Sequence, residues 1–402
     1  MTASRRPADA WVPQYFLSSV GAGGLAVAFF IWLYMWVPHP GQQVPVFEDI
    51  MAAWNTGKPL IQAMIATSVL AILILAALNL RLLAWNLGQF ARYRRSEAMT
   101  KLRTTNGESQ LLTLPLAIAM SINVGFILGL VLVPGLWSVV EYLFPVAMAA
   151  FLATGLLALA QIGRFYGRVF GKGGFDCAGN NSFAQVMPAF ALGMVGVGLS
   201  ASAAMSANPM TAGTSIVLAA IFLVLSVLIA TGAVVLGLVS MAQHGASVEA
   251  APSLTMIVPL MTVLGILTLR VTHGLGVHFE AHATPGDYLW MLSGFLGIQI
   301  AFLLFGTTVL RAQGYLGRFV TGPEASAGSY GLVCPGVAFS VMMQFFINKG
   351  LVGAGLIAKF GLAYWLLSSV AIAALIATVV LVVILNRKHF RFVDEPQGFP
   401  AE

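Results

Sequence analysis

Ten apolar segments, each close to the length needed to cross a lipid bilayer, run through this chain from one end to the other. We predict them at 15–36, 60–80, 111–133, 138–161, 184–206, 211–240, 252–271, 287–310, 331–348 and 357–386. A membrane-spanning helix needs about 20 residues, and only 8% of the residues are charged, against roughly 25% in soluble domains. The sequence therefore predicts an all-α polytopic membrane protein, with one transmembrane domain at 15–386 between short tails at 1–14 and 387–402.

A proline recurs near one end of alternate apolar segments. It stands in LTLPLAIAM (Pro115), QVMPAFALG (Pro188), MIVPLMTVL (Pro259) and LVCPGVAFS (Pro335), at intervals of 73, 71 and 76 residues. Pro13, in WVPQYFLSS, precedes Pro115 by 102 residues. A repeat of this period indicates one two-helix unit used five times, as tandem hairpins. Because proline removes a backbone donor and bends a helix, we expect five bent odd helices around a central axis, with the even helices outside.

The basic residues lie mainly on one side of the predicted membrane. Sixteen of the 20 Lys and Arg residues fall on the side of the two termini, and the opposite side holds Lys58, Arg270, Lys349 and Lys359. Basic loops stay in the cytoplasm, so the pattern predicts cytoplasmic N- and C-termini in a bacterial inner membrane. This distribution also explains the net charge of +6, and we predict the lipid bilayer, not a nucleic acid, as its counterpart. The first segment has no secretory cleavage site, and we expect it to be retained.

Small and polar residues concentrate on the odd segments. On the ninth segment, Ser340, Gln344 and Asn348 lie at i, i+4 and i+8 and so share one helical stripe. Such stripes either pack helices closely or line a polar path, and both interpretations stay open for any single stripe. Since all of them lie on odd segments, we predict a shared polar axis. The pore-lining candidates are Ser121, Gly193, Ser200, Thr255, Thr262, Ser340, Gln344 and Asn348.

Charged residues are missing from the middle of the segments. All 14 acidic residues lie in loops or near segment ends, with Glu141 closest to the interior. Intramembrane carboxylates usually mark proton relays and cation paths, so their absence argues against a cation channel and a proton-coupled carrier. No basic residue is expected in mid-membrane either, which argues against a tight anion site built on arginine. A neutral path of hydroxyls, amides and helix ends suits weak, fast passage of a small anion or neutral solute.

Ten segments, cytoplasmic termini and five tandem hairpins with proline-marked odd helices resemble the tellurite-resistance/dicarboxylate transporter superfamily, which includes the plant slow anion channels. The resemblance covers about residues 11–390. It implies odd helices around a central pore, a homotrimer, and a small inorganic or organic anion as the substrate. The stretch YGLVCPGVAFSVMMQFFINKG is also similar to TsoY-type membrane (seleno)proteins. Chloride, nitrate, dicarboxylates and oxyanions of sulfur, selenium or tellurium all remain open as substrates.

In the channel members of this superfamily a phenylalanine plugs the pore. On the ninth segment, Phe345 lies at the edge of the stripe centred on Gln344. Phe126 on the third segment and Phe190 on the fifth are the other gate candidates. Packing against lipid or neighbouring helices is the alternative interpretation for each of the three.

Two cysteines fall on the predicted cytoplasmic side, where a structural disulfide is not expected. Cys334 directly precedes Pro335, and Cys177 lies in the loop GKGGFDCAGNNS. Cys334 is either a small buried apolar residue, which is the more common case, or a reactive thiol at the mouth of the path, to which the selenoprotein-type similarity adds weight. The alternative function is therefore a membrane-embedded thiol-dependent enzyme or redox protein that uses Cys334.

The loop HGLGVHFEAH contains His273, His278, Glu280 and His282. These residue types suit zinc, but the pattern is not HExxH, and we expect an ordinary polar loop with no metal or cofactor. The sequence contains no phosphate-binding glycine loop and no Ser-His-Asp set. We therefore predict a transport protein, not an enzyme: a channel or facilitative transporter for a small anion or oxyanion, with a membrane scaffold as a further alternative.

Overall fold

The computed structural model describes residues 4–391 and 393–394. Among them, ten helices are long and apolar enough to cross a membrane. These are α1 (Phe16–Trp36), α3 (Pro59–Tyr93), α5 (Thr113–Leu132), α6 (Val140–Lys172), α7 (Met187–Leu199) with its continuation α8 (Ala201–Met205), α9 (Pro209–His244), α10 (Ile257–His278), α11 (Pro285–Ala312), α12 (Val333–Phe345) and α13 (Leu362–Phe390). The all-α class and the number of spans are confirmed, and the chain fits a multi-pass membrane protein.

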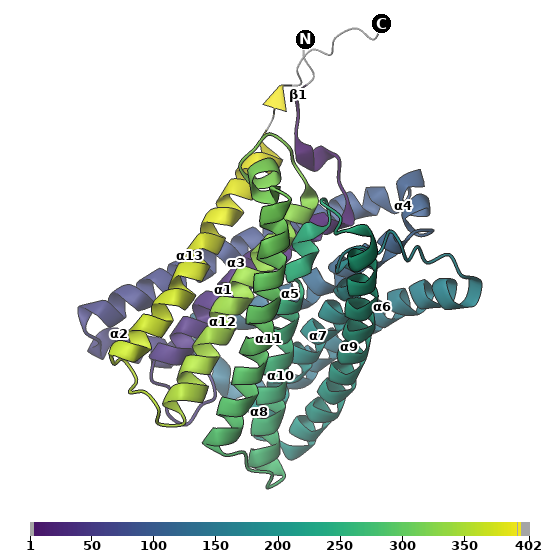
Figure 1. Cartoon of the computed structure of the whole chain (residues 1–402). Coiled ribbons are helices and arrows are strands. Elements are labelled where there is room, and N and C mark those ends of the chain that lie inside the picture. The colour runs from purple at the N-terminus through teal and green to yellow at the C-terminus, as the bar shows by residue number, and fades with distance from the viewer. Residues whose placement is uncertain (1–3, 392, 395–402) are drawn as a thin grey trace, which may run out of the picture.

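Short elements connect the long helices. They are the helices α2 (Phe47–Thr56) and α4 (Glu97–Leu102), the 3₁₀ turns η1 (Pro7–Asp9) and η4 (Leu136–Val139), and the π-helices η7 (Leu316–Val320) and η9 (Phe346–Val352). Strand β1 (Ser4–Arg5) pairs antiparallel with β2 (Val393–Asp394). This pairing brings the two ends of the described chain together at one end of the bundle (Figure 1). We call that end the terminal end and the opposite one the far end.

The ten spans form two classes by burial. In the most apolar 18 residues of each span, 56–94% of the residues are buried for α1, α5, α7, α10 and α12, but only 22–28% for α3, α6, α9, α11 and α13. We call the first set the inner helices and the second set the outer helices. The inner helices contact one another in the closed order α1, α5, α7, α10, α12 and back to α1. Each outer helix packs against the inner helix that precedes it in the chain.

Each outer helix turns one narrow stripe inward. In α3 the buried residues recur every three or four positions: Ile65, Ser68, Ile72, Leu75, Ala76, Asn79, Leu82 and Asn86. Polar members of these stripes bond to the inner helices, because Asn79 Nδ2 donates to the Ser19 carbonyl at 2.8 Å and Ser226 Oγ donates to the Ala189 carbonyl at 2.7 Å. Hydrogen bonds between helices are a main source of specificity where both lipid and protein are apolar, so they fix each outer helix on its partner.

The recurring prolines lie in the first turn of the inner helices. Pro115, Pro259 and Pro335 are the third residues of α5, α10 and α12, and Pro188 is the second residue of α7. Pro13 begins a separate 3₁₀ turn before α1. In the first turn of a helix the missing N–H has no intrahelical partner to lose. The prolines therefore mark helix starts, and bending of the inner helices stays a prediction.

Five short 3₁₀ segments lead into the inner helices and meet at the terminal end. They are η2 (Pro13–Tyr15), η3 (Asn106–Leu112), η5 (Ala184–Val186), η6 (Ala251–Thr255) and η8 (Ala327–Leu332), and we call them the 3₁₀ collar. Contacts join η2 to η3 and η8, η3 to η5, and η6 to η8. Between η5 and η6, the Phe183 N–H donates to Ser253 Oγ at 3.1 Å. The collar is thus a closed ring of its own.

A serine marks four of the collar segments in the sequence. Ser109, Ser182, Ser253 and Ser329 each stand six residues before a recurring proline. The hydroxyls of Ser109 and Ser253 donate to the carbonyls three residues earlier, at 3.1 and 2.6 Å. Local bonds of this kind compete with α-helix formation, so the Ser-x5-Pro pattern marks a tight turn followed by a helix start.

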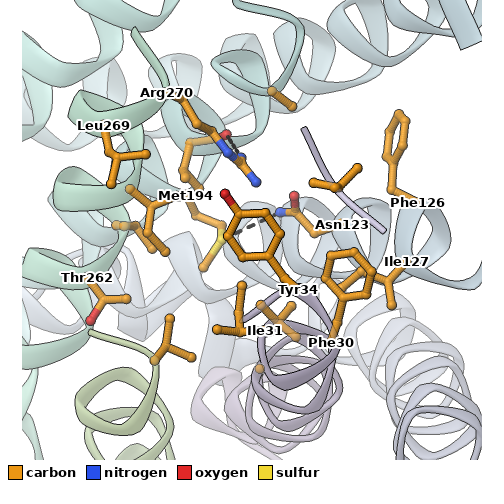
Figure 2. A pocket seen from close by; sticks show the side chains of 18 of the residues that line it. Phe30, Ile31, Tyr34, Asn123, Phe126, Ile127, Met194, Thr262, Leu269 and Arg270 are labelled. Atoms are coloured by element: carbon orange, nitrogen blue, oxygen red, sulfur yellow. Dashed lines mark hydrogen bonds between the residues drawn. The ribbon is translucent and has the colours of Figure 1, made fainter. Parts of the chain in front are cut away.

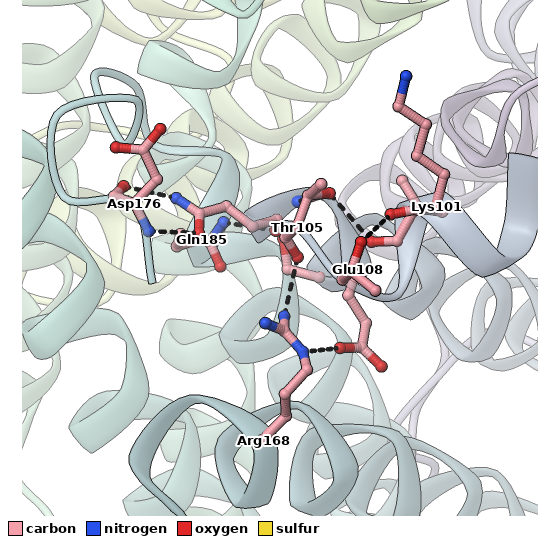
Figure 3. Close-up of polar contacts among 11 residues, drawn as sticks. Lys101, Thr105, Glu108, Arg168, Asp176 and Gln185 are labelled. Atoms are coloured by element: carbon pink, nitrogen blue, oxygen red, sulfur yellow. Dashed lines mark hydrogen bonds and ion pairs between the residues drawn. The ribbon is translucent and has the colours of Figure 1, made fainter. Parts of the chain in front are cut away.

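Figure 3 shows a polar network that ties two collar segments to α6. Arg168 Nε on α6 donates to Glu108 Oε2 in η3 at 3.0 Å. Asn106 exchanges hydrogen bonds of 2.7 and 3.1 Å with the backbone of Asp176, and its carbonyl accepts from Gln185 Nε2 at 2.9 Å. These bonds hold the starts of α5 and α7 in place at the terminal end.

Candidate functional site

A pocket of about 340 Å³ lies between the inner helices. Along α12 and η9 its lining runs from Cys334 to Lys349, which corresponds to roughly 20 Å at the helical rise per residue. Gln43 and Lys349, at the far end of the lining, are exposed on the protein surface. At the opposite end of the lining, Val20 is 1% and Phe190 2% exposed. The pocket therefore opens toward the far end and is closed above the collar.

Arg270, on α10, places a guanidinium in this pocket (Figure 2). Its Nη1 donates to the Val197 carbonyl at 2.7 Å, and the part of the chain that the structure describes gives it no ion pair. A guanidinium has five N–H donors, so several remain for a ligand. Among the described residues, no Asp or Glu lines the pocket. A cation in such surroundings is costly unless a counter-charge joins it.

The length of α10 brings Arg270 into the bundle. The sequence predicted a span that ends at residue 271, whereas α10 continues to His278, about two turns beyond Arg270. Gly274 permits this extension, because a Cβ there would collide with the Ala203 carbonyl of α8. Arg270 thus lies inside the bundle, and an arginine-based anion site, against which the sequence argued, becomes a candidate.

Tyr34 and Lys349 also line the open half of the pocket. Figure 2 shows the Tyr34 hydroxyl and the Arg270 guanidinium pointing toward one another. The Tyr34 ring stacks on His39 at 5.4 Å and lies 6.0 Å from the Phe345 ring, centroid to centroid. Lys349 Nζ lies 5.2 Å from the Tyr34 ring centroid, a cation–π distance. The ring contacts hold Tyr34 in place between two cations.

The deep part of the pocket, from Arg270 toward the collar, is apolar. Its polar side chains are Thr262, whose Oγ1 donates to the Ala338 carbonyl at 2.9 Å, and Asn123, whose Nδ2 donates to the Ala119 carbonyl at 3.0 Å. The other deep lining residues are Val20, Gly21, Gly24, Val27, Met120, Phe190, Met194, Val197, Pro259, Val263, Ile266, Cys334, Val337, Ala338 and Val341. The charged side chains of the lining, Arg270 and Lys349, thus lie in the open half of the pocket.

Of the eight predicted pore-lining residues, Thr262 lines this pocket and the others do not. Gly193 faces Val263 of α10 and Ser226 of α9. The hydroxyls of Ser121, Ser200 and Thr255 donate to carbonyls three or four residues earlier in the chain. Gly193 thus lies between helices, and the three hydroxyls are used locally in the chain.

The stripe formed by Ser340, Gln344 and Asn348 faces α13. The Tyr364 hydroxyl of α13 donates to Asn348 Oδ1 at 3.1 Å. Ser340 Oγ and Gln344 Nε2 are buried without a hydrogen-bond partner among the described residues. The residues of α12 that line the pocket are Cys334, Val337, Ala338, Val341 and Phe345. The pocket lies beside a different face of this helix from the one the polar pattern indicated.

All three gate candidates, Phe126, Phe190 and Phe345, line the pocket. Phe345 packs on Tyr34 in the open half, and Phe126 lies away from Arg270 at the edge of the view in Figure 2. Phe190 is 2% exposed and belongs to the closed end. Its position makes Phe190 the candidate that separates the pocket from the collar.

Both cysteines are free, with Cys177 exposed in its loop and Cys334 in the pocket lining. Cys334 is 5% exposed and lies at the closed end.

His278 Nε2 lies 3.0 Å from the Ser206 carbonyl. No group of three or more His, Cys, Asp and Glu side chains that could hold a metal occurs among the residues that the structure describes.

No protein-family model matches this chain, and no curated protein matches it. The resemblance to the tellurite-resistance/dicarboxylate transporter superfamily thus stays a prediction from topology and repeat. A proposal about function therefore depends on the residues that line the pocket.

Proposed function

We propose that this chain is a membrane channel or facilitative transporter for a small anion, and that the central pocket is part of its path. The observation that carries the proposal is the Arg270 guanidinium, which among the described residues has one backbone acceptor and no carboxylate partner. Lys349 adds a second positive charge at the pocket mouth. A pocket whose charged lining residues are all basic attracts anions and repels cations.

The arrangement of the helices supports the same proposal. A closed circuit of contacts among the inner helices is what the superfamily resemblance implies for a central pore with outer helices around it. The resemblance adds a homotrimer, and the excess of basic residues at the terminal end favours a cytoplasmic position for that end in a bacterial inner membrane. We propose both together with the transport function.

The proposed path needs one further opening. The pocket ends at Phe190, and the 3₁₀ collar lies between it and the terminal end. In this proposal Phe190 and the collar form the closed gate, and anions pass when the inner helices separate at that end.

Purified protein in liposomes provides the test. Under a salt gradient, the reversal potential should follow the anion, since Arg270 and Lys349 favour anions in the pocket. A reversal potential that follows the cation, or the absence of any flux beyond protein-free liposomes, would contradict the proposal.

A membrane thiol enzyme or redox protein is the second candidate, because Cys334 lines the pocket. Treatment with a membrane-permeant alkylating reagent should then abolish activity in the unchanged protein but not in Cys334→Ser. Equal flux before and after complete alkylation of Cys334 would exclude a catalytic thiol.

A further inference from the structure

We infer that the pocket binds an organic monoanion: one carboxylate or sulfonate head at Arg270 and an apolar body in the deep part. This inference rests on the proposed anion transport and names its substrate class. Neither a bare inorganic ion nor a dicarboxylate matches the distribution of polar groups in the pocket as well.

The head group belongs at Arg270. A guanidinium offers paired N–H donors in the geometry of a carboxylate or sulfonate, and among the described residues Arg270 uses one donor, on the Val197 carbonyl. The Tyr34 hydroxyl points toward the same place (Figure 2). His273 Nε2 in the same lining is buried without a hydrogen-bond partner among the described residues. These groups surround one anionic head in the open half.

The body of the ligand belongs in the deep part. From Arg270 back to Thr262 the helix α10 makes about two turns, or roughly 12 Å. The Thr262 hydroxyl already makes two hydrogen bonds: it donates to the Ala338 carbonyl and accepts from Gln299 Nε2 at 2.6 Å. An ion that lost its hydration water there would find no replacement donors. Apolar surface, by contrast, is stabilised when it leaves water for such walls.

The number of charged heads follows from the same layout. The cations of the lining, Arg270 and Lys349, both lie in the open half, and the deep lining holds none. A dicarboxylate that extended into the deep part would bury its second carboxylate without a partner, which is strongly unfavourable. The pocket volume of about 340 Å³ also falls within the range of small-molecule sites, about 300 to 1,000 Å³, far larger than one ion needs.

A series of ligands tests the inference on the full chain in lipid nanodiscs, with binding measured by titration calorimetry. Affinity should rise about fourfold for each methylene from acetate through butyrate to hexanoate, and benzoate should bind more tightly than acetate. Succinate, chloride and nitrate should all bind more weakly than hexanoate. Equal affinities along the series, or tighter binding of succinate or chloride, would overturn the inference and leave anion transport standing.

Variants separate the head from the body. Arg270→Gln should weaken hexanoate binding about tenfold or more, since a charge-assisted contact is lost, whereas Arg270→Lys should retain more of it. Lys58→Gln removes a charge on the same side outside the pocket lining and should change nothing. If hexanoate bound the unchanged protein and Arg270→Gln equally well, the head assignment would be wrong. If no anion bound or crossed the membrane at all, both this inference and the proposed function would fail.

Discussion

The two ends of the inner helices differ in kind. At the terminal end the repeated units are alike: a 3₁₀ turn, a serine and a proline lead into four of the five inner helices, and the turns close a collar. Toward the far end the units diverge, and α10 alone of the inner helices places an arginine in the pocket. The repeat therefore builds the frame, and a departure from the repeat within one unit places the guanidinium in the pocket.

The largest effect on flux is expected at Arg270, where α10 departs from the other inner helices. Replacing it with Gln should lower anion flux at least tenfold, because the charge-assisted contact of the path is lost. Arg270→Lys keeps the charge and should retain a larger part of the flux. Liposome flux with each variant, at matched protein reconstitution, measures the effect. Full flux through Arg270→Gln would mean that the divergent end does not carry the function.

The closed end is tested at Phe190. Phe190→Ala should raise flux several-fold, because it removes the side chain that closes the pocket, although a buried Phe→Ala change also costs about 3–5 kcal/mol of stability. Phe222→Ala is the matched control, since Phe222 is equally buried on α9 but outside the pocket lining. The control should lose similar thermal stability without faster flux. Faster flux in both variants would point to general loosening in place of a gate.

A smaller effect is expected at Gln344, on the α13 side of α12. Gln344→Leu should leave flux within about twofold and keep or raise the melting temperature, because replacing a buried amide that lacks one partner is nearly neutral or stabilising. Asn348 would lose the Gln344 Oε1 contact at 3.2 Å but keep the backbone one at 2.9 Å. Flux and thermal unfolding of the same preparation provide the measurement. A clear change in ion selectivity would show that this stripe lines the path.

The smallest effect is expected for the exposed pair Arg318–Glu324 at the terminal end. The hydrogen bond from Arg318 holds the pKa of the Glu324 carboxyl below its usual value. A lowered folded-state pKa contributes stability at neutral pH, and that contribution disappears as the pH falls through the lowered pKa. Both side chains are exposed, so solvent screens the pair. Glu324→Gln should therefore leave flux and melting temperature unchanged at neutral pH, and a large shift would show a role for this loop.

Much of the scaffold could be predicted because it depends on patterns that repeat. Apolar length identified ten spans, and the recurring prolines identified the five helices that the structure buries. The end of the helix that contains Arg270 could not be predicted from the sequence. Glycine is common at helix ends, and two glycines follow Arg270, so the pattern indicated an end where the helix in fact continues. The face of α12 that lines the pocket could not be predicted from the polar stripe. Ser340 and Gln344 are buried polar residues between two helices, and such a stripe has the same spacing whether it faces water or a neighbouring helix.

The repeat itself nevertheless contains the signal for Arg270. Eleven residues after each recurring proline stand Phe126, Leu199, Arg270 and Phe346. Three large apolar residues and one arginine at equivalent positions mark the arginine as an exception within a frame of equivalent helices. When the repeats are aligned by their prolines, Arg270 occupies the same position as Phe126, which lies inside the bundle.

The opening of the pocket at the far end has an electrical consequence. With the terminal end in the cytoplasm, as proposed, an anion that reaches Arg270 from outside moves into an inside-negative field. Moving one charge through a full 100 mV costs about 2.3 kcal/mol, which is about a fiftyfold difference in equilibrium concentration. A passive path of this kind therefore works as an exit for its anion, and uptake requires an outside concentration high enough to overcome the potential.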